Sequence, residues 1–241
     1  RIKEENIEKI ISILLKKFTP DHLLYKLLIY RLAISNIYLA KFEKYATDKG
    51  KKIKIFNVGE MILERAKLSR QKINPNNILN MRPDTMQALR SGVFENILRE
   101  VPLLKREGYS IIVNIHGIFY WKHRYKKSID YYDISQLNPD LYVNFLNNSD
   151  VVAQNMRSQP KWDFLFRNRP VDYVLERIME WQTAEIEIVS TVATFSRKNI
   201  FIVPAGGSES ILYRFMFERE WRKIFYLSMP LTFLGGDEHE E

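Results

Sequence analysis

Residues 110–116, Ser110-Ile-Ile-Val-Asn-Ile-His116, form a short apolar run that is rich in β-branched side chains and ends in polar ones. Such a run is typical of a β-strand. Similar runs occupy residues 52–56, 141–146 and 199–203. Helical patterns separate these runs, over residues 83–98, over 171–195 and after Gly206-Gly207-Ser208. The alternation predicts an α/β fold with a mainly parallel sheet of five strands, flanked by helices.

Two of these helices carry acidic residues that bear on their local structure. Asp84 follows Pro83, and we expect it to cap the N-terminus of that helix. Glu180, Glu185 and Glu187 lie on the helix at 171–195 with no basic partner in view. We therefore expect these three side chains on the surface.

The first 49 residues form a separate N-terminal segment in this interpretation, before an α/β domain at 50–227 and a tail at 228–241. Residues 7–15 show the apolar periodicity of an amphipathic helix. Residues 21–49 are compatible with one long helix stopped by Gly50, or with a strand at Leu27-Leu-Ile29, a loop and a helix. Periodicity does not choose between the two. The apolar faces of this segment would cover the sheet, or bind a protein partner or a second copy.

Composition excludes several classes of site. The chain has 241 residues and no cysteine, which excludes disulfides, thiolate metal sites and cysteine nucleophiles. Its four histidines are scattered, so we expect no metal centre. The longest apolar region, residues 23–42, is interrupted by polar and charged residues, which argues against a membrane span. No signal peptide is visible, and we expect a cytoplasmic protein.

Five motifs in order carry a family resemblance. They are Phe56-Asn-Val-Gly-Glu-Met61, Pro83-Asp-Thr85, Ile111-Ile-Val-Asn-Ile-His116, Leu137-Asn-Pro-Asp-Leu-Tyr-Val143 and Arg167-Asn-Arg169. Over residues 50–204 the chain resembles the archaeal-type adenylate kinases. The resemblance implies a P-loop kinase fold of three layers, an AMP site, a mobile lid at about 155–172, and phosphate transfer from ATP with Mg²⁺.

The chain departs from this family where phosphate and metal should bind. A P-loop kinase has a glycine-rich loop with a lysine after its first strand. The corresponding residues 30–38, Tyr-Arg-Leu-Ala-Ile-Ser-Asn-Ile-Tyr, hold no glycine and no lysine. The family also places an aspartate that organises the metal where this chain has Asn114. An amide lacks the charge that favours Mg²⁺.

Several residues that match the family's phosphate-binding regions remain. Arginine guanidinium groups suit bidentate phosphate contacts, and the lid supplies three of them. The candidates for nucleotide or phosphate binding are Arg157, Arg167, Arg169, His116, Asn114, Asn57 and Arg82.

A second segment interleaves basic and aromatic residues. This pattern is typical of single-stranded nucleic-acid binding, because the cations contact phosphates and the rings stack on bases. The candidates are Tyr120, Trp121, Lys122, His123, Arg124, Lys126 and Lys127. The formal net charge of +8 is compatible with a polyanionic partner such as RNA or a ribonucleoprotein.

The sequence therefore predicts a divergent adenylate-kinase-like protein without phosphotransfer activity. It would bind a nucleotide, RNA or a protein complex, and the sequence identifies no cofactor for it. The alternative is an active nucleoside monophosphate kinase whose phosphate loop lies upstream of Arg1, with ATP, AMP and Mg²⁺ as its ligands.

Overall fold

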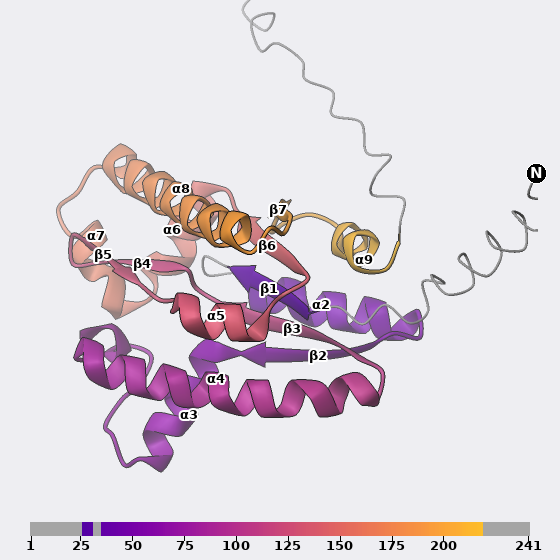
Figure 1. Ribbon diagram of the computed structural model, residues 1–241. Helices are drawn as coiled ribbons and strands as arrows, with labels where there is room; N and C mark the ends of the chain where they lie inside the picture. The colour runs from indigo at the N-terminus through magenta and orange to yellow at the C-terminus, as the bar shows by residue number, and fades with distance from the viewer. Residues whose placement is uncertain (1–25, 31–34, 219–241) are drawn as a thin grey trace, which may run out of the picture.

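The computed structural model describes residues 26–30 and 35–218 (Figure 1). Helices alternate with strands, which confirms the α/β class predicted from the sequence. The strands that pair in parallel are β1 Lys26–Tyr30, β2 Lys52–Asn57, β3 Tyr109–Ile115, β6 Leu141–Leu146 and β7 Ile200–Pro204. Four of them match the apolar runs of the sequence.

The parallel strands lie side by side in the order β2-β3-β1-β6-β7. β1 thus lies between β3 and β6, and its Ile29 is in register with Asn114 of β3. The N-terminal segment therefore resolves as a strand and then a helix, α2 Ser35–Asp48, rather than as one long helix. β1 lies in the same sheet as the other parallel strands, and α2 packs on the core of that sheet.

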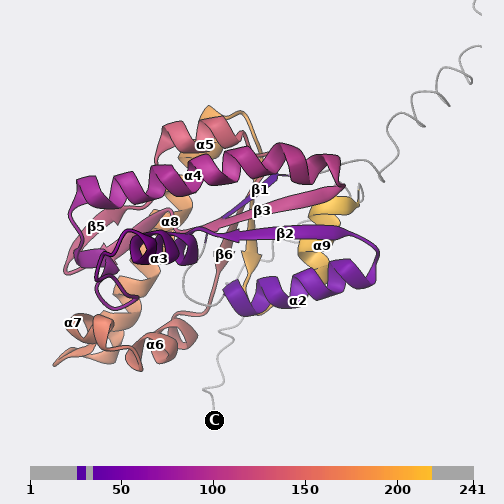
Figure 2. The ribbon, with the colours of Figure 1, turned by 90° about the horizontal axis from the view of Figure 1, so that it is seen from below.

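Helices cover both faces of this sheet. α2 connects β1 to β2 in one direction across the sheet, whereas α3 Val58–Leu68 and α4 Pro83–Arg106 connect β2 to β3 in the other. Right-handed crossovers place such connections on opposite faces. Figure 2 shows α2 and α9 Glu209–Phe217 on one side of the sheet, and α4 and α5 Tyr131–Leu137 on the other.

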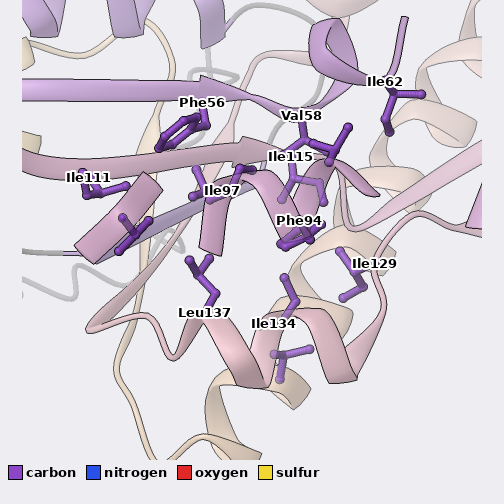
Figure 3. Close-up of a cluster of buried hydrophobic side chains, with 14 of the residues drawn as sticks. Phe56, Val58, Ile62, Phe94, Ile97, Ile111, Ile115, Ile129, Ile134 and Leu137 are labelled. Atoms are coloured by element: carbon purple, nitrogen blue, oxygen red, sulfur yellow. The ribbon is translucent and has the colours of Figure 1, made fainter. Parts of the chain in front are cut away.

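Each face has its own hydrophobic core. On the α4 side, side chains of β2, β3, α4 and α5 point toward one another, with Phe94, Ile97 and Ile134 fully buried (Figure 3). On the α2 side, Phe42 packs with Leu212 and Met216 of α9. Burial of aliphatic and aromatic area in these two layers is the main stabilising contribution to the fold.

A third cluster lies beyond the carboxyl end of the sheet. It joins the hairpin β4 Ile118–Trp121 and β5 Arg124–Lys127 to the long helix α8 Val171–Phe195. The predicted lid region is also part of it, as α6 Ser149–Arg157, the 3₁₀ turn η3 Pro160–Trp162 and α7 Asp163–Phe166. This aromatic cluster, which we define as Trp121, Trp162, Phe164 and Trp181, fixes the lid against the hairpin.

Some local expectations need correction. Asp84 does not cap α4, because Arg82 occupies the N-cap position and Asp84 lies inside the first turn. Ser208 caps α9 through a hydrogen bond from the backbone N–H of Ser210, and that helix ends at Phe217. The predicted helix at residues 7–15 and the tail at 228–241 lie outside the described residues. Among the described helices, none combines the length and the apolarity that crossing a membrane requires.

Candidate functional site

A cavity of about 650 Å³ opens at the carboxyl end of the sheet. Its wall includes Asn36 at the start of α2, residues 58–60 after β2, and residues 114–116 at the end of β3. The connection that follows β1 runs toward the β2 edge of the sheet, whereas the connection that follows β3 runs toward β6 and the opposite edge. Open α/β sheets bind ligands at such a switch of direction, and the volume suits a small organic molecule.

Three asparagines from three different elements meet at this end of the sheet, and two of them, Asn36 and Asn114, line the cavity. Nδ2 of Asn114 donates to Oδ1 of Asn57 at 2.6 Å and to Oδ1 of Asn36 at 3.2 Å. Asn114 is only 1% exposed, and its Oδ1 is buried without a hydrogen-bond donor within reach among the described residues. The asparagines are neutral, but Oε1 of Glu60 accepts from Nδ2 of Asn36 at 3.2 Å, so one carboxylate lies beside them. The free Oδ1 of Asn114 is an acceptor that a ligand or water can satisfy.

His116 forms the next part of the wall. It is half-buried at the end of β3, with its ring centroid 4.4 Å from that of Phe119. The backbone that follows it is held by Glu185 of α8, whose Oε1 accepts from the N–H of Gly117 at 2.6 Å. Glu185 is fully buried, and burial raises its pKa to about 8. The expectation that Glu185 lies on the surface is wrong, whereas Glu187 is exposed as expected.

The charged part of the wall is mostly basic. Arg90 of α4 is 7% exposed, and its Nη1 donates to Oε1 of Gln87 at 3.0 Å. Lys126 and Lys127 reach the cavity from β5, and the half-buried Lys161 reaches it from η3. Burial lowers the pKa of Lys161. Since Glu60 is the single acidic residue among the described lining residues, the cavity favours an anion.

The remaining wall is aromatic. Trp162 and Trp181 line the cavity together with Phe119, and the rings of the two tryptophans lie 5.3 Å apart. The indole N–H of Trp181 donates to the carbonyl of Ile118 at 2.8 Å, which fixes that ring. A planar, apolar ligand group can pack here, while its polar groups meet the basic and amide side chains.

The structure brings together only some of the predicted phosphate-binding residues. Asn114 and His116 line the cavity, and Asn57 lies beside it as a hydrogen-bond acceptor for Asn114. Arg82 does not line it and forms an exposed ion pair with Asp84 at 3.0 Å. The three lid arginines are also exposed and outside the lining: Arg157, Arg167 and Arg169. The guanidinium of Arg157 lies over the ring of Phe166, and that of Arg169 lies over the ring of Tyr173.

The predicted nucleic-acid segment is split between interior and surface. Tyr120 and Trp121 are buried, so their rings are not available for stacking on bases at the surface. The tip residues Lys122 and His123 are exposed, and both have positive φ, which is the two-residue turn of a tight hairpin. Arg124, Lys126 and Lys127 are also exposed. The basic half of the prediction therefore lies on the surface, and the aromatic half does not.

The asparagines themselves are poor ligands for Mg²⁺. This ion requires oxygen ligands, usually including a carboxylate, whereas Asn114 directs its N–H groups at the oxygens of both neighbouring asparagines. Glu60 is the one carboxylate in the described lining, and its Oε1 already accepts from Asn36. The described part of the chain contains no cluster of three or more His, Asp or Glu side chains that could hold a metal ion.

Sequence reasoning missed several residues that line the cavity or support its wall, and periodicity carried a signal for some of them. Gln87 and Arg90 are three residues apart on α4, which places them on one helical face. Glu185 lies four residues from both Trp181 and Val189, on the buried stripe of α8. Lys161 and Trp162 carried no such signal, because only the tertiary fold brings the lid over the cavity.

No family model matches the chain, and no curated protein matches it either.

Proposed function

We propose that this chain is a nucleotide-binding module on an adenylate-kinase-like fold, and that it does not transfer phosphate. The observation that carries the proposal is the cavity at the carboxyl end of the sheet, which combines an aromatic wall with basic side chains. Trp162 and Trp181 suit a base, whereas Arg90 and Lys127 suit a phosphate. The strand order and the helix layers support the finer assignment to a P-loop-kinase-like fold of three layers.

Two features support a binding role rather than catalysis. The residues between β1 and α2, Arg31-Leu-Ala-Ile34, contain neither the glycine that lets a backbone approach phosphates nor the lysine that contacts them. The neutral amide of Asn114 takes the place of the acid that organises the metal in the family resemblance. Loss of both would remove most of the transition-state stabilisation on which phosphoryl transfer relies.

Titration calorimetry with ATP, ADP and AMP tests the binding. We expect saturable binding of at least one nucleotide. A coupled assay with ATP, AMP and Mg²⁺ tests the second part, and we expect no turnover above background. Turnover in the usual kinase range of about 1–100 s⁻¹ would instead favour the active kinase.

We propose RNA binding at the β4–β5 hairpin as a second candidate function. Five basic side chains, histidine included, are exposed within residues 122–127. Tyr131 and Tyr132 are exposed just beyond the hairpin, and the ammonium of Lys127 lies 5.7 Å from the ring of Tyr131. These tyrosines, rather than Tyr120 and Trp121, could stack on bases. Positive φ in two non-glycine residues is also costly, as is common where function requires a strained turn.

Fluorescence anisotropy with a labelled single-stranded RNA, measured over a range of salt concentrations, tests this candidate. The double variant Lys122→Gln/Arg124→Gln should bind more weakly. It should also lower the slope of log affinity against log salt by about 1.4, because each lost contact with a single strand contributes about 0.7. The control Lys41→Gln/Lys44→Gln removes the same charge from exposed positions of α2. Its slope should stay close to that of the wild type. Equal slopes for both variants would show that binding depends on net charge and not on the hairpin.

A further inference from the structure

β7 is an edge strand of the sheet, and within the described part of the chain only one of its sides is paired. It pairs in parallel with β6. The carbonyl of Asn199 accepts from the N–H of Tyr142, and the N–H of Ala205 donates to the last carbonyl of β6. Because backbone groups alternate in direction along a strand, the N–H and C=O groups of Ile200 and Ile202 point away from β6. These groups are available to a further extended chain.

The two edges of the sheet differ in their protection against such pairing. The β2 edge carries the exposed Lys52 and Lys54, and lysines on an edge strand discourage pairing with another chain. β7, whose sequence is Ile200-Phe-Ile-Val-Pro204, has no charged residue. Ile202 is 51% exposed and lies on the same face of the sheet as the half-buried Ile200. An apolar, uncharged edge is typical of a strand that pairs with another chain.

Pro204 limits how a new strand can pair with β7. It lies at an outward-pointing position, where its missing N–H costs no hydrogen bond to β6. Its carbonyl already accepts from the N–H of Gly207 at 2.9 Å. A new strand can therefore use the backbone groups of Ile200 and Ile202, but not those of Pro204. An antiparallel second copy uses all of them when the Ile200 of each copy pairs with the Ile202 of the other.

The charges at the two ends of β7 favour the same arrangement. Arg197 and Lys198 precede the strand, whereas Glu209 follows it at the start of α9. None of the three forms an ion pair within 4.0 Å in the described part of the chain. Antiparallel pairing places the basic end of each copy beside the acidic end of the other, whereas parallel pairing would place like charges together. The edge is thus complementary to itself in charge as well as in its hydrogen-bonding groups.

We propose that two copies of this chain pair through their β7 edges, antiparallel and about a two-fold axis, to form one continuous sheet. Such an interface is isologous, because each copy offers the same strand to the other. The surface lies outside the lining of the cavity. The inference therefore goes beyond the proposed function and does not depend on it.

Sedimentation of the full chain over a range of concentrations tests the proposal. The wild type should form a dimer with a Kd of about 1–100 μM, because a short edge strand buries little area. Ile202→Lys places a charge on the open edge and should weaken the dimer by at least about tenfold. Leu103→Lys makes the same change at an aliphatic residue of α4 that is 57% exposed, and the dimer should keep its affinity.

The charged ends of the strand provide a test of orientation. Lys198→Glu and Glu209→Lys should each weaken the dimer, because each places like charges together across the axis. The double variant restores opposite charges in reverse, so its affinity should exceed that of both single variants. A double variant that dimerises no better than the weaker single variant would overturn the antiparallel arrangement.

Cross-linking tests the same contact if Ile202→Lys does not fold. The chain has no cysteine, so Ile202→Cys carries a single thiol. In the proposed register the two positions lie diagonally across the pair, with a separation of about 7–8 Å. A short bismaleimide should therefore join two copies of Ile202→Cys and should not join two copies of Leu103→Cys at the same concentration.

Three results would overturn the proposal without bearing on nucleotide binding. One is a wild type that stays monomeric at every concentration up to about 1 mM. Another is a dimer that Ile202→Lys and Leu103→Lys weaken equally, since it would then form through another surface. The third is cross-linking of Leu103→Cys that is as efficient as that of Ile202→Cys.

Discussion

The buried carboxyl group of Glu185 accepts a hydrogen bond from the backbone N–H of Gly117 at 2.6 Å, between residues 68 positions apart in the chain. Its second oxygen lies 3.4 Å from the backbone nitrogen of Ile118. The indole of Trp181, one turn earlier on α8, donates to the carbonyl of the same Ile118. α8 thus holds the link between β3 and β4, where His116 and Phe119 enter the cavity wall.

The first prediction concerns the pH dependence of stability. Because burial raises the pKa of Glu185 from 4.5 to about 8, the folded state retains a proton that the unfolded chain releases. The contribution of Glu185 to stability is therefore complete below about pH 4.5 and is lost as the pH rises to about 8. Urea unfolding at several pH values should show the wild type losing up to about 1.4 kcal/mol per pH unit relative to Glu185→Gln.

The neutral glutamine keeps an acceptor for Gly117 and removes the titration. Glu187→Gln changes an exposed carboxylate on the same helix and should follow the wild-type curve. Parallel curves for Glu185→Gln and the wild type would contradict the assignment.

The second prediction concerns the hydrogen bond of Trp181. Trp181→Phe removes the donor to the carbonyl of Ile118 and leaves a small void, so the free energy of unfolding should fall by about 2–4 kcal/mol. Trp162→Phe makes the same change at a similarly buried ring for which no such bond is seen among the described residues. Chemical denaturation should show a smaller loss in the free energy of unfolding for Trp162→Phe than for Trp181→Phe. Equal losses would mean that the hydrogen bond of Trp181 contributes nothing to stability.

The third prediction uses tryptophan fluorescence to locate the ligand. Trp162 lines the cavity, whereas Trp121 packs behind it at a ring distance of 5.7 Å and does not line it. A nucleotide base that packs against the aromatic wall should change the emission of the wild type and of Trp121→Phe. The change should be smaller in Trp162→Phe, in which Trp181 is the remaining tryptophan of the wall. If Trp121→Phe removes the signal instead, the base does not bind at this wall.

The fourth prediction concerns the strained hairpin turn. His123 has a φ of 63°, which glycine adopts without strain. His123→Gly should therefore raise the free energy of unfolding by up to about 1 kcal/mol. The gain is reduced because the variant also removes the contact between Nδ1 of His123 and the hydroxyl of Tyr120. If the turn serves RNA binding, the same variant should bind RNA more weakly, as anisotropy would show. A more stable variant with unchanged RNA affinity would show that the strain of this turn does not serve RNA binding.

Much of the fold could be predicted from local pattern. The strands at 52–57, 109–115, 141–146 and 200–204 are β-branched runs between turn residues, and α8 matches its predicted range of 171–195. β1 was ambiguous because Leu27-Leu-Ile29 satisfies both a strand and a helix period. Its neighbours on both sides in the sheet make it a strand, and these come from residues 109–115 and 141–146.

The residue types of the candidate site were partly visible in the same way. Asn57 ends β2 and Asn114 is the last residue but one of β3, and parallel strands bring their carboxyl ends to one edge of the sheet. That much follows from the sequence pattern and the rules of parallel sheets. Their partner Asn36 became visible only once β1 had placed the start of α2 beside them.

Long-range packing alone determined which polar groups are buried. Glu185 and Arg90 look like ordinary helix-surface residues in the sequence, yet both are buried, on the inner faces of α8 and α4. Tyr120 and Trp121 look accessible, yet the lid covers them. Burial depends on which other part of the chain packs against a side chain, and the local sequence does not determine that packing. The strands and their polar ends were therefore set by local sequence, and the charge and shape of the cavity by tertiary contact.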